Sequence, residues 1–146
     1  MSPVKLAIVG MGMIGKRHLQ AMRTIEEAEL TAVVDPAGQA KEIALNNGVP
    51  WFATIEEMVA EVVPEGVIVS TPTEIHLEPT IKVLEAGSHV LVEKPIAANL
   101  DEANEIQKVA ERVNRNVIVG HHRRYYGLME LAREIVSSEK LGRLLA

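Results

Sequence analysis

Short runs of apolar residues alternate along the chain with segments in which apolar residues recur at helical spacing. The apolar runs are continuous, which is typical of strands buried on both faces when helices cover a parallel sheet. These runs predict strands at residues 4–10, 30–35, 66–70, 89–93 and 116–120, with a weaker one at 50–53. Helical spacing predicts helices at residues 14–25, 39–46, 55–62, 76–85 and 100–113. The order of elements therefore predicts an α/β fold with a doubly wound parallel sheet of about six strands.

Turn and capping residues fall at the ends of these predicted helices. Gly48 and Gly87 follow helices where a left-handed cap is favoured, and Thr54 stands at capping-box spacing from Glu57. Asn99 is placed to cap the helix that starts at the next residue. No linker rich in glycine, serine or proline interrupts the chain before position 120. We therefore expect residues 1–122 to form one domain.

The C-terminal residues 123–146 follow a different pattern. Helical spacing covers residues 125–140, and residues 141–146 resemble a turn entering a further strand. A strand without a partner would be an exposed sheet edge, so we expect the chain to be cut from something longer. The alternative is a natural C-terminus that frays.

Composition narrows the classes of partner. The chain has 146 residues, with 15 Lys and Arg against 20 Asp and Glu, which gives a formal charge of -5. This balance lacks the broad positive field of a nucleic-acid-binding protein, so we expect no nucleic-acid partner. Cysteine is absent, which excludes disulfides and thiolate chemistry and favours the cytoplasm. The longest apolar run, residues 6–14, is too short to cross a bilayer, so we expect no membrane span.

A glycine motif follows the first predicted strand. Gly10, Gly12 and Gly15 form G-x-G-x-x-G around Met13 and Ile14, between a strand and a helix. In that position Gly10 allows a tight turn, Gly12 lets the backbone approach a pyrophosphate, and Gly15 allows close packing of helix on strand. Asp35 stands about 20 residues further on, at a strand end where a carboxylate accepts hydrogen bonds from ribose hydroxyls.

These features predict a Rossmann-type domain that binds NAD. We expect NADP to bind less well, because Asp35 would repel a ribose 2′-phosphate and Pro36 replaces an arginine that could neutralise it. The structural alternative is that the glycines only form a turn and that Asp35 only caps the next helix.

Polar residues follow the fourth and fifth predicted strands, where ligands of open α/β sheets bind. Ser70, Thr71, Pro72, Thr73 and His76 could line the cofactor site. Thr73 could instead cap the next helix. The position of His76 is as consistent with a structural role as with a functional one.

Glu93 and Lys94 stand before Pro95, whose ring restrains Lys94. A lysine there could bind a substrate hydroxyl and relay its proton during hydride transfer. The alternative is a surface ion pair between Glu93 and Lys94.

The sequence resembles the N-terminal half of the Gfo/Idh/MocA family of oxidoreductases over nearly its whole length. The matching segments are residues 10–18, Asp35, residues 71–76, residues 86–95 and residues 120–125. The resemblance implies that Lys94 is catalytic and that His122 and Arg123 face the cofactor and substrate. It also implies a sugar or polyol substrate, a homo-oligomeric full-length protein and a second α/β domain, which we expect to lie outside these 146 residues. The expected cofactor-binding residues are Gly10, Gly12, Met13, Ile14, Gly15, Asp35, Ser70, Thr71, Pro72, Thr73, His76, Glu93, Lys94 and Arg123.

Several side chains have competing interpretations. The basic cluster at residues 121–124 could contact phosphates, and its two adjacent histidines point to opposite faces of a strand, so we expect no metal site. His18 and His89 are expected to be structural. A free-standing dinucleotide-binding module without catalysis is the alternative function. Lys94 argues against it, because a binding module has no need of a lysine beside the nicotinamide.

Overall fold

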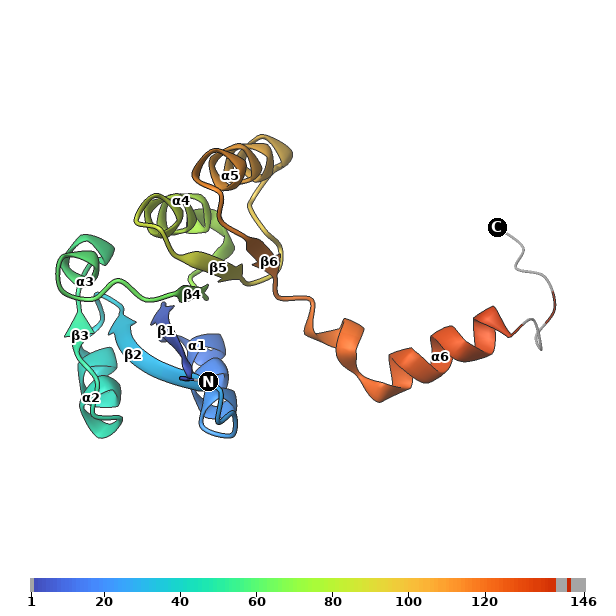
Figure 1. Cartoon of the computed structure of the whole chain (residues 1–146), viewed down its shortest axis with the longest axis horizontal. Helices are drawn as coiled ribbons and strands as arrows, with labels where there is room; N and C mark the ends of the chain where they lie inside the picture. The colour runs from blue at the N-terminus through green and yellow to red at the C-terminus, as the bar shows by residue number, and fades with distance from the viewer. Residues whose placement is uncertain (1, 139–141, 143–146) are drawn as a thin grey trace.

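The computed structural model describes residues 2–138 and 142, and its centre is a sheet of six parallel strands. The strands are β1 (Val4–Val9), β2 (Ala28–Val34), β3 (Trp51–Phe52), β4 (Gly66–Val69), β5 (His89–Val92) and β6 (Val117–Val119). Their spatial order is β3-β2-β1-β4-β5-β6 (Figure 1). This is the order of a Rossmann fold, and the reversal between β1 and β4 opens a crevice at the carboxyl ends of the strands. The predicted fold class is confirmed.

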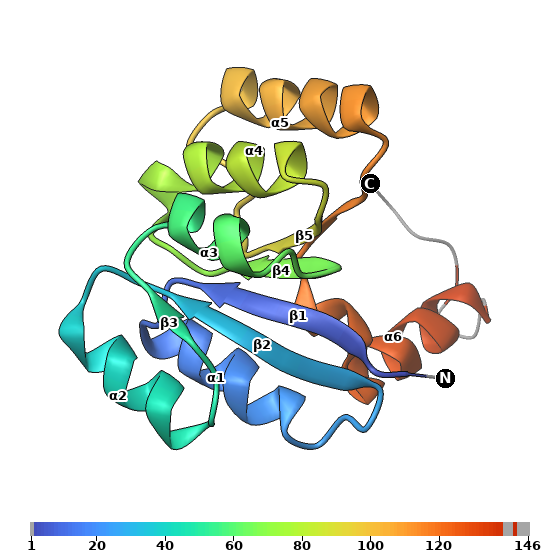
Figure 2. The same cartoon turned by 60° about the vertical axis from the view of Figure 1, so that its left-hand side comes forward.

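Helices cover both faces of the sheet (Figure 2). The helices are α1 (Met13–Met22), α2 (Gly38–Asn46), α3 (Ile55–Glu61), α4 (Leu77–Glu85) and α5 (Leu100–Val113), with the 3₁₀ turn η1 (Thr73–Ile75) before α4. Figure 2 shows α1 and α2 on one face and α3, α4 and α5 on the other. On β1, Ile8 packs in the cluster with Leu19 of α1, whereas Ala7 and Val9 pack in the cluster with Met58 of α3. Because successive side chains point to opposite faces and both faces are buried, the strands carry continuous apolar runs.

The predicted caps are present. Gly48 and Gly87 follow α2 and α4 with positive φ angles of 67° and 95°, a conformation that glycine adopts without strain. The Thr54 and Glu57 side chains form a complete capping box at the start of α3. The Asn99 side chain accepts a hydrogen bond from the backbone N–H of residue 102 at 2.9 Å, which caps α5.

The chain after β6 leaves the sheet. It forms the 3₁₀ turn η2 (His122–Tyr125) and then helix α6 (Gly127–Ser137), which extends away from the sheet in Figure 1. The helix begins two residues later than expected because Tyr125 belongs to η2. The side chains of α6 are exposed, and Leu128 is 78% exposed. Most of the strand expected at residues 141–146 lies outside the described residues, and the boundary between residues 1–122 and 123–146 stays a prediction.

Among the residues that the structure describes, no helix is both long and apolar enough to cross a membrane.

Candidate active site

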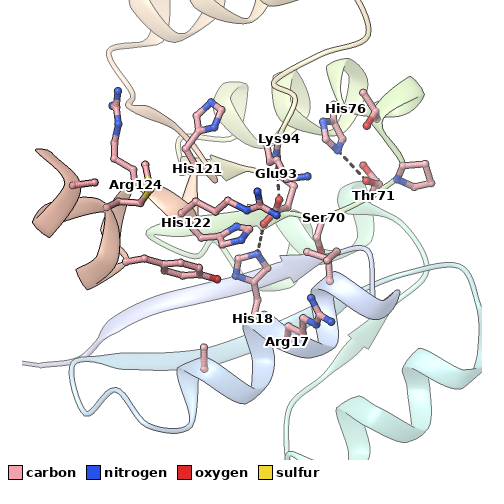
Figure 3. Close-up of a pocket in the computed structure, with 18 of the residues that line it drawn as sticks. Arg17, His18, Ser70, Thr71, His76, Glu93, Lys94, His121, His122 and Arg124 are labelled. Carbon is pink, nitrogen blue, oxygen red and sulfur yellow. Dashed lines mark hydrogen bonds and ion pairs between the residues drawn. The ribbon is translucent and has the colours of Figure 1, made fainter. Parts of the chain in front are cut away.

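Two hollows lie along the carboxyl ends of the strands. The smaller, of about 470 Å³, is lined from the glycine turn, the end of β2 and the start of α2. The larger, of about 1440 Å³, is lined from α1, the segments after β4, β5 and β6, and α6 (Figure 3). Of the predicted residues, Gly12, Met13 and Asp35 line the smaller hollow. The larger one is lined by Ile14, Ser70, Thr71, Pro72, Thr73, His76, Glu93, Lys94, His122 and Arg123.

The three glycines of the turn have different steric surroundings. Gly10 has a φ of 90°, and a Cβ there would lie 2.8 Å from the backbone N of Thr71. A Cβ on Gly15 would lie 2.0 Å from the carbonyl oxygen of Gly10, so α1 and the turn approach too closely for any side chain. A Cβ on Gly12 would meet no atom within 4 Å. Gly10 and Gly15 are therefore required by the fold, whereas Gly12 leaves open space above the backbone.

Ser70 holds the glycine turn against the end of β4. Its buried hydroxyl donates a hydrogen bond to the carbonyl oxygen of Gly10 at 2.7 Å and lies 3.3 Å from that of Val9. Thr71, the next residue, has a buried hydroxyl without a hydrogen-bond partner among the described residues. Since buried polar groups are almost always paired, the Thr71 hydroxyl is a candidate contact for a bound polar molecule.

Asp35 is held beside the glycine turn at the end of β2. One carboxylate oxygen accepts from the backbone N–H of Met11 at 2.6 Å, and the other accepts from that of Ala37 at 2.8 Å. Helix α1 starts after Gly12 with no side-chain cap, so its first backbone N–H groups have no intrahelical acceptor. Open space over Gly12, free amides at a helix N-terminus and a carboxylate at the end of β2 fit the pyrophosphate and ribose of NAD.

The Glu93 carboxylate is bound on three sides. One oxygen lies 2.9 Å from Nε2 of His18 on α1, and the other accepts from the backbone N–H of Lys94 at 3.1 Å (Figure 3). A Cβ on Gly120 would lie 3.0 Å from the same carboxylate, so the backbone just after β6 also packs against it. Within residues 2–138, Glu93 makes no ion pair with the Lys94 ammonium. The structure therefore does not have the alternative arrangement, a surface ion pair between Glu93 and Lys94. The peptide bond between Lys94 and Pro95 is cis.

His76 joins the two segments that follow β4 and β5. Its ring is 1% exposed, with Nδ1 2.9 Å from the carbonyl oxygen of Pro95 and Nε2 2.9 Å from that of Thr71. The side chain of His76 therefore links the backbone after β4 to the backbone after β5, beneath the larger hollow. A contact between His76 and a cofactor stays a prediction. Thr73 lies in η1 and makes no side-chain cap.

Helix α1 contributes lining residues that the sequence analysis did not assign to the site. Arg17, His18 and Ala21 line the larger hollow together with the predicted residue Ile14, and the spacing of the four places them on one face of a helix. That spacing, directly after the glycine motif, is the signal that could have identified Arg17 and His18. His18 was expected to be structural, and its pairing with Glu93 brings it to the edge of the larger hollow.

The segment after β6 closes the other side of the larger hollow. His122 lies with its ring 5.7 Å from that of Tyr126 at an angle of 53°, and Figure 3 shows it facing His18. His121 and Arg124 also line this side. His89 lies elsewhere, where its Nδ1 accepts from the backbone N–H of Asn116 at 3.0 Å, a structural role as expected. No group of three or more potential metal ligands occurs among the described side chains.

Comparison with known proteins identifies the family. The model of the oxidoreductase family with an NAD-binding Rossmann fold, GFO_IDH_MocA, matches residues 4–121. Glucose-6-phosphate 3-dehydrogenase of Bacillus subtilis is 32% identical over 97% of this chain and 40% of that protein. D-glucoside 3-dehydrogenase of Escherichia coli is 33% identical over 98% of this chain and 42% of that protein.

A solved structure agrees with the sequence comparisons. The crystal structure of myo-inositol 2-dehydrogenase from Lactobacillus plantarum superimposes with a TM-score of 0.92 and 28% identity over 99% of this chain and 44% of that chain. The chain thus spans less than half the length of each of these relatives. The family model covers most of the chain, so the protein belongs to the Gfo/Idh/MocA oxidoreductase family, with an NAD-binding Rossmann fold over residues 4–121.

Proposed function

We propose that the chain binds NAD across the two hollows and serves in hydride transfer between the nicotinamide and a sugar or polyol. The observation that carries the proposal is that the two hollows are neighbours with Arg17 in both linings. Asp35 and Gly12, with open space over Gly12, line the smaller hollow, and Lys94 lines the larger one. The ribose of adenosine would bind Asp35, and the pyrophosphate would lie on the free amides at the start of α1. The nicotinamide would then reach the larger hollow near Thr71.

We propose NAD rather than NADP as the cofactor. The Asp35 carboxylate already accepts two backbone N–H groups, which fixes its oxygens at the ribose position. A fixed carboxylate attracts ribose hydroxyls and repels a 2′-phosphate. Lys16 and Arg17 line the smaller hollow together with Asp35, and their positive charges would attract a 2′-phosphate. A direct comparison of NAD and NADP affinity is therefore the decisive measurement.

The proposed chemistry assigns the proton to Lys94. Bound NAD supplies the ring that accepts the hydride from the substrate carbon. As the C–H bond breaks, the hydroxyl oxygen loses its proton to the Lys94 amine and becomes a carbonyl, so charge and atoms balance. In the reverse direction the Lys94 ammonium returns the proton. The sugar or polyol class rests on the names of the relatives, which include a sugar-phosphate, a glucoside and an inositol dehydrogenase.

The remaining proposals keep the expectations drawn from the sequence. We propose a small-molecule substrate, a homo-oligomer for the full-length protein and a cytoplasmic location, and no nucleic-acid or membrane partner. A free-standing binding module without catalysis is not favoured. Lys94 is the distinguishing residue, because dinucleotide binding alone has no need of an ammonium in the larger hollow.

Calorimetric titration of NAD and NADP into the purified chain tests the proposal. We expect NAD to bind more tightly than NADP, Asp35→Ala to weaken NAD binding, and Lys94→Ala to leave it nearly unchanged. Glu29→Ala is the matched control, because it removes an exposed carboxylate of β2 that lines neither hollow. Failure of both cofactors to bind, or equal affinity of wild type and Asp35→Ala, would overturn the assignment.

A further inference from the structure

The charges around the larger hollow are strongly one-sided. The chain carries 15 Lys and Arg and 20 Asp and Glu, yet within residues 2–138 the acidic lining of this hollow is the single residue Glu93. Its basic lining is Arg17, Lys94, Arg123, Arg124 and Arg133. An acidic protein that places a third of its permanent cations around one cavity has concentrated positive charge there.

These cations have no counter-ions among the residues that the structure describes. Across the described residues, none of the five forms an ion pair or a side-chain hydrogen bond. The only acidic group in the hollow is already engaged, because the Glu93 carboxylate pairs with His18 and accepts the N–H of Lys94. Like charges that share a concave surface repel one another, and a bound anion relieves that repulsion.

The position of the arginines separates two anion sites. Arg17 lines both hollows, which places it on the path of the pyrophosphate. The other three line only the larger hollow and come from η2 and α6, across from α1. Figure 3 shows Arg124 and His121 together on the side away from Arg17. We name Arg123, Arg124 and Arg133 the basic rim.

We propose that the basic rim binds an anionic group of the substrate, a phosphate monoester or a carboxylate, while a substrate hydroxyl faces Lys94. This inference rests on the proposed function, because it takes the larger hollow as the substrate site. The pyrophosphate of the cofactor does not account for the rim, since the open space at Gly12 and the free amides of α1 already provide for it. Guanidinium groups suit both anions because they form paired hydrogen bonds to two oxygens.

The test uses three sugars that share a ring and differ in one group. Glucose 6-phosphate, glucuronate and glucose are titrated by calorimetry into the chain saturated with NAD. Because a hydrogen bond to a charged group contributes about 1.5–3 kcal/mol, we expect at least one charged sugar to bind about tenfold or more tightly than glucose. Tighter binding of the phosphate identifies a phosphate monoester, and tighter binding of glucuronate identifies a carboxylate.

Matched double variants locate the site. Arg124→Gln with Arg133→Gln should remove the preference for the charged sugar. Arg23→Gln with Arg112→Gln removes the same charge from surface positions outside both hollows and should keep the preference. Circular dichroism and NAD affinity report whether each variant is folded.

Four results would overturn the inference. They are equal binding of all three sugars, a rim variant that binds like wild type, charged-sugar binding that a titration without NAD detects but that NAD abolishes, and a rim that prefers an oligonucleotide to the charged sugars. The third would show that the arginines serve the cofactor phosphates. A wild-type chain that binds no NAD would instead refute the proposed function, so the two failures are distinguishable.

Discussion

Gly12 and Gly15 should respond to the same substitution in opposite ways. An alanine methyl at Gly12 meets no atom within 4 Å, so it fits the folded protein but enters the space proposed for the pyrophosphate. The methyl at Gly15 would lie 2.0 Å from the carbonyl oxygen of Gly10, so the helix or the turn must move. We therefore expect Gly12→Ala to lose NAD binding with little change in stability, and Gly15→Ala to lose stability first.

The magnitudes follow from these contacts. At position 12, alanine is a poorer N-cap than glycine, which lowers the free energy of unfolding by about 0.5 kcal/mol. Alanine also reduces the entropy of the unfolded chain, which raises the free energy of unfolding by about the same amount. The free energy of unfolding should therefore change by less than about 0.5 kcal/mol. Displacing a phosphate from one backbone N–H costs about 1.5–3 kcal/mol, which weakens NAD binding about tenfold to a hundredfold. At Gly15, overpacking against backbone should cost about 1–3 kcal/mol or more of stability.

Urea unfolding and calorimetry measure the two effects separately. The chain has one tryptophan, Trp51, whose indole N–H donates to the carbonyl oxygen of Asp35 at 2.9 Å. Its fluorescence therefore reports unfolding next to the proposed ribose site. Gly127→Ala is the control, because its methyl also meets no atom within 4 Å and it lies outside the glycine turn. Wild-type NAD affinity in Gly12→Ala, or wild-type stability in Gly15→Ala, would refute the assignment of these two glycines.

Three further substitutions test other contacts. Ser70→Ala should lower the free energy of unfolding by about 1–3 kcal/mol, measured in urea, because it leaves the buried carbonyl of Gly10 without its 2.7 Å donor. His76→Phe keeps the ring volume but removes the ring nitrogens that lie 2.9 Å from the two carbonyl oxygens, so it should cost about 1–3 kcal/mol, and wild-type stability would contradict the bridging role. On the surface, a hydrogen bond from Lys82 lowers the pKa of Glu56 below 4.5, and the same bond raises the pKa of Lys82 above 10.5. The ion pair therefore stabilises the fold at pH values between the ordinary pKa values of the two groups. This stabilisation is lost as pH falls through the lowered pKa of Glu56 or rises through the raised pKa of Lys82. The Lys82 and Glu56 side chains are 38% and 61% exposed, and Lys82 also pairs with Glu78. Because water reaches both ion pairs, Lys82→Met should cost less than about 1 kcal/mol in thermal melts at pH 7 and nothing at pH 2.

The fold was predictable because strands that are buried on both faces have continuous apolar runs in the sequence. Ile8 and Val9 belong to different clusters on opposite faces of β1, so no polar residue interrupts that run. The short strand β3 gave a weaker signal because it has only the two residues of Trp51–Phe52. The start of α6 was misplaced because helical spacing alone does not distinguish a 3₁₀ turn such as η2 from the helix that follows.

The site was predictable where the chain itself brings residues to the carboxyl edge of the sheet. Gly12, Asp35 and Lys94 each follow a parallel strand, and parallel strands end at the same edge. The pairing of His18 with Glu93 joins residues 75 positions apart. Neither side chain carries a sequence signal for the other, because their contact depends on how α1 packs beside the end of β5.

The long-range contact between His18 and Glu93 changes the role that we assign to Glu93, the acidic residue next to Lys94. From the sequence, Glu93 is the natural counter-ion of the adjacent ammonium. In the structure one carboxylate oxygen faces His18, the other accepts the backbone N–H of Lys94, and Gly120 packs against both. The carboxylate therefore fixes the Lys94 backbone while, within residues 2–138, it forms no ion pair with the side chain. A lysine side chain that is held in place without a carboxylate partner among the described residues is available to bind a hydroxyl and exchange a proton with it, which is the role proposed for Lys94.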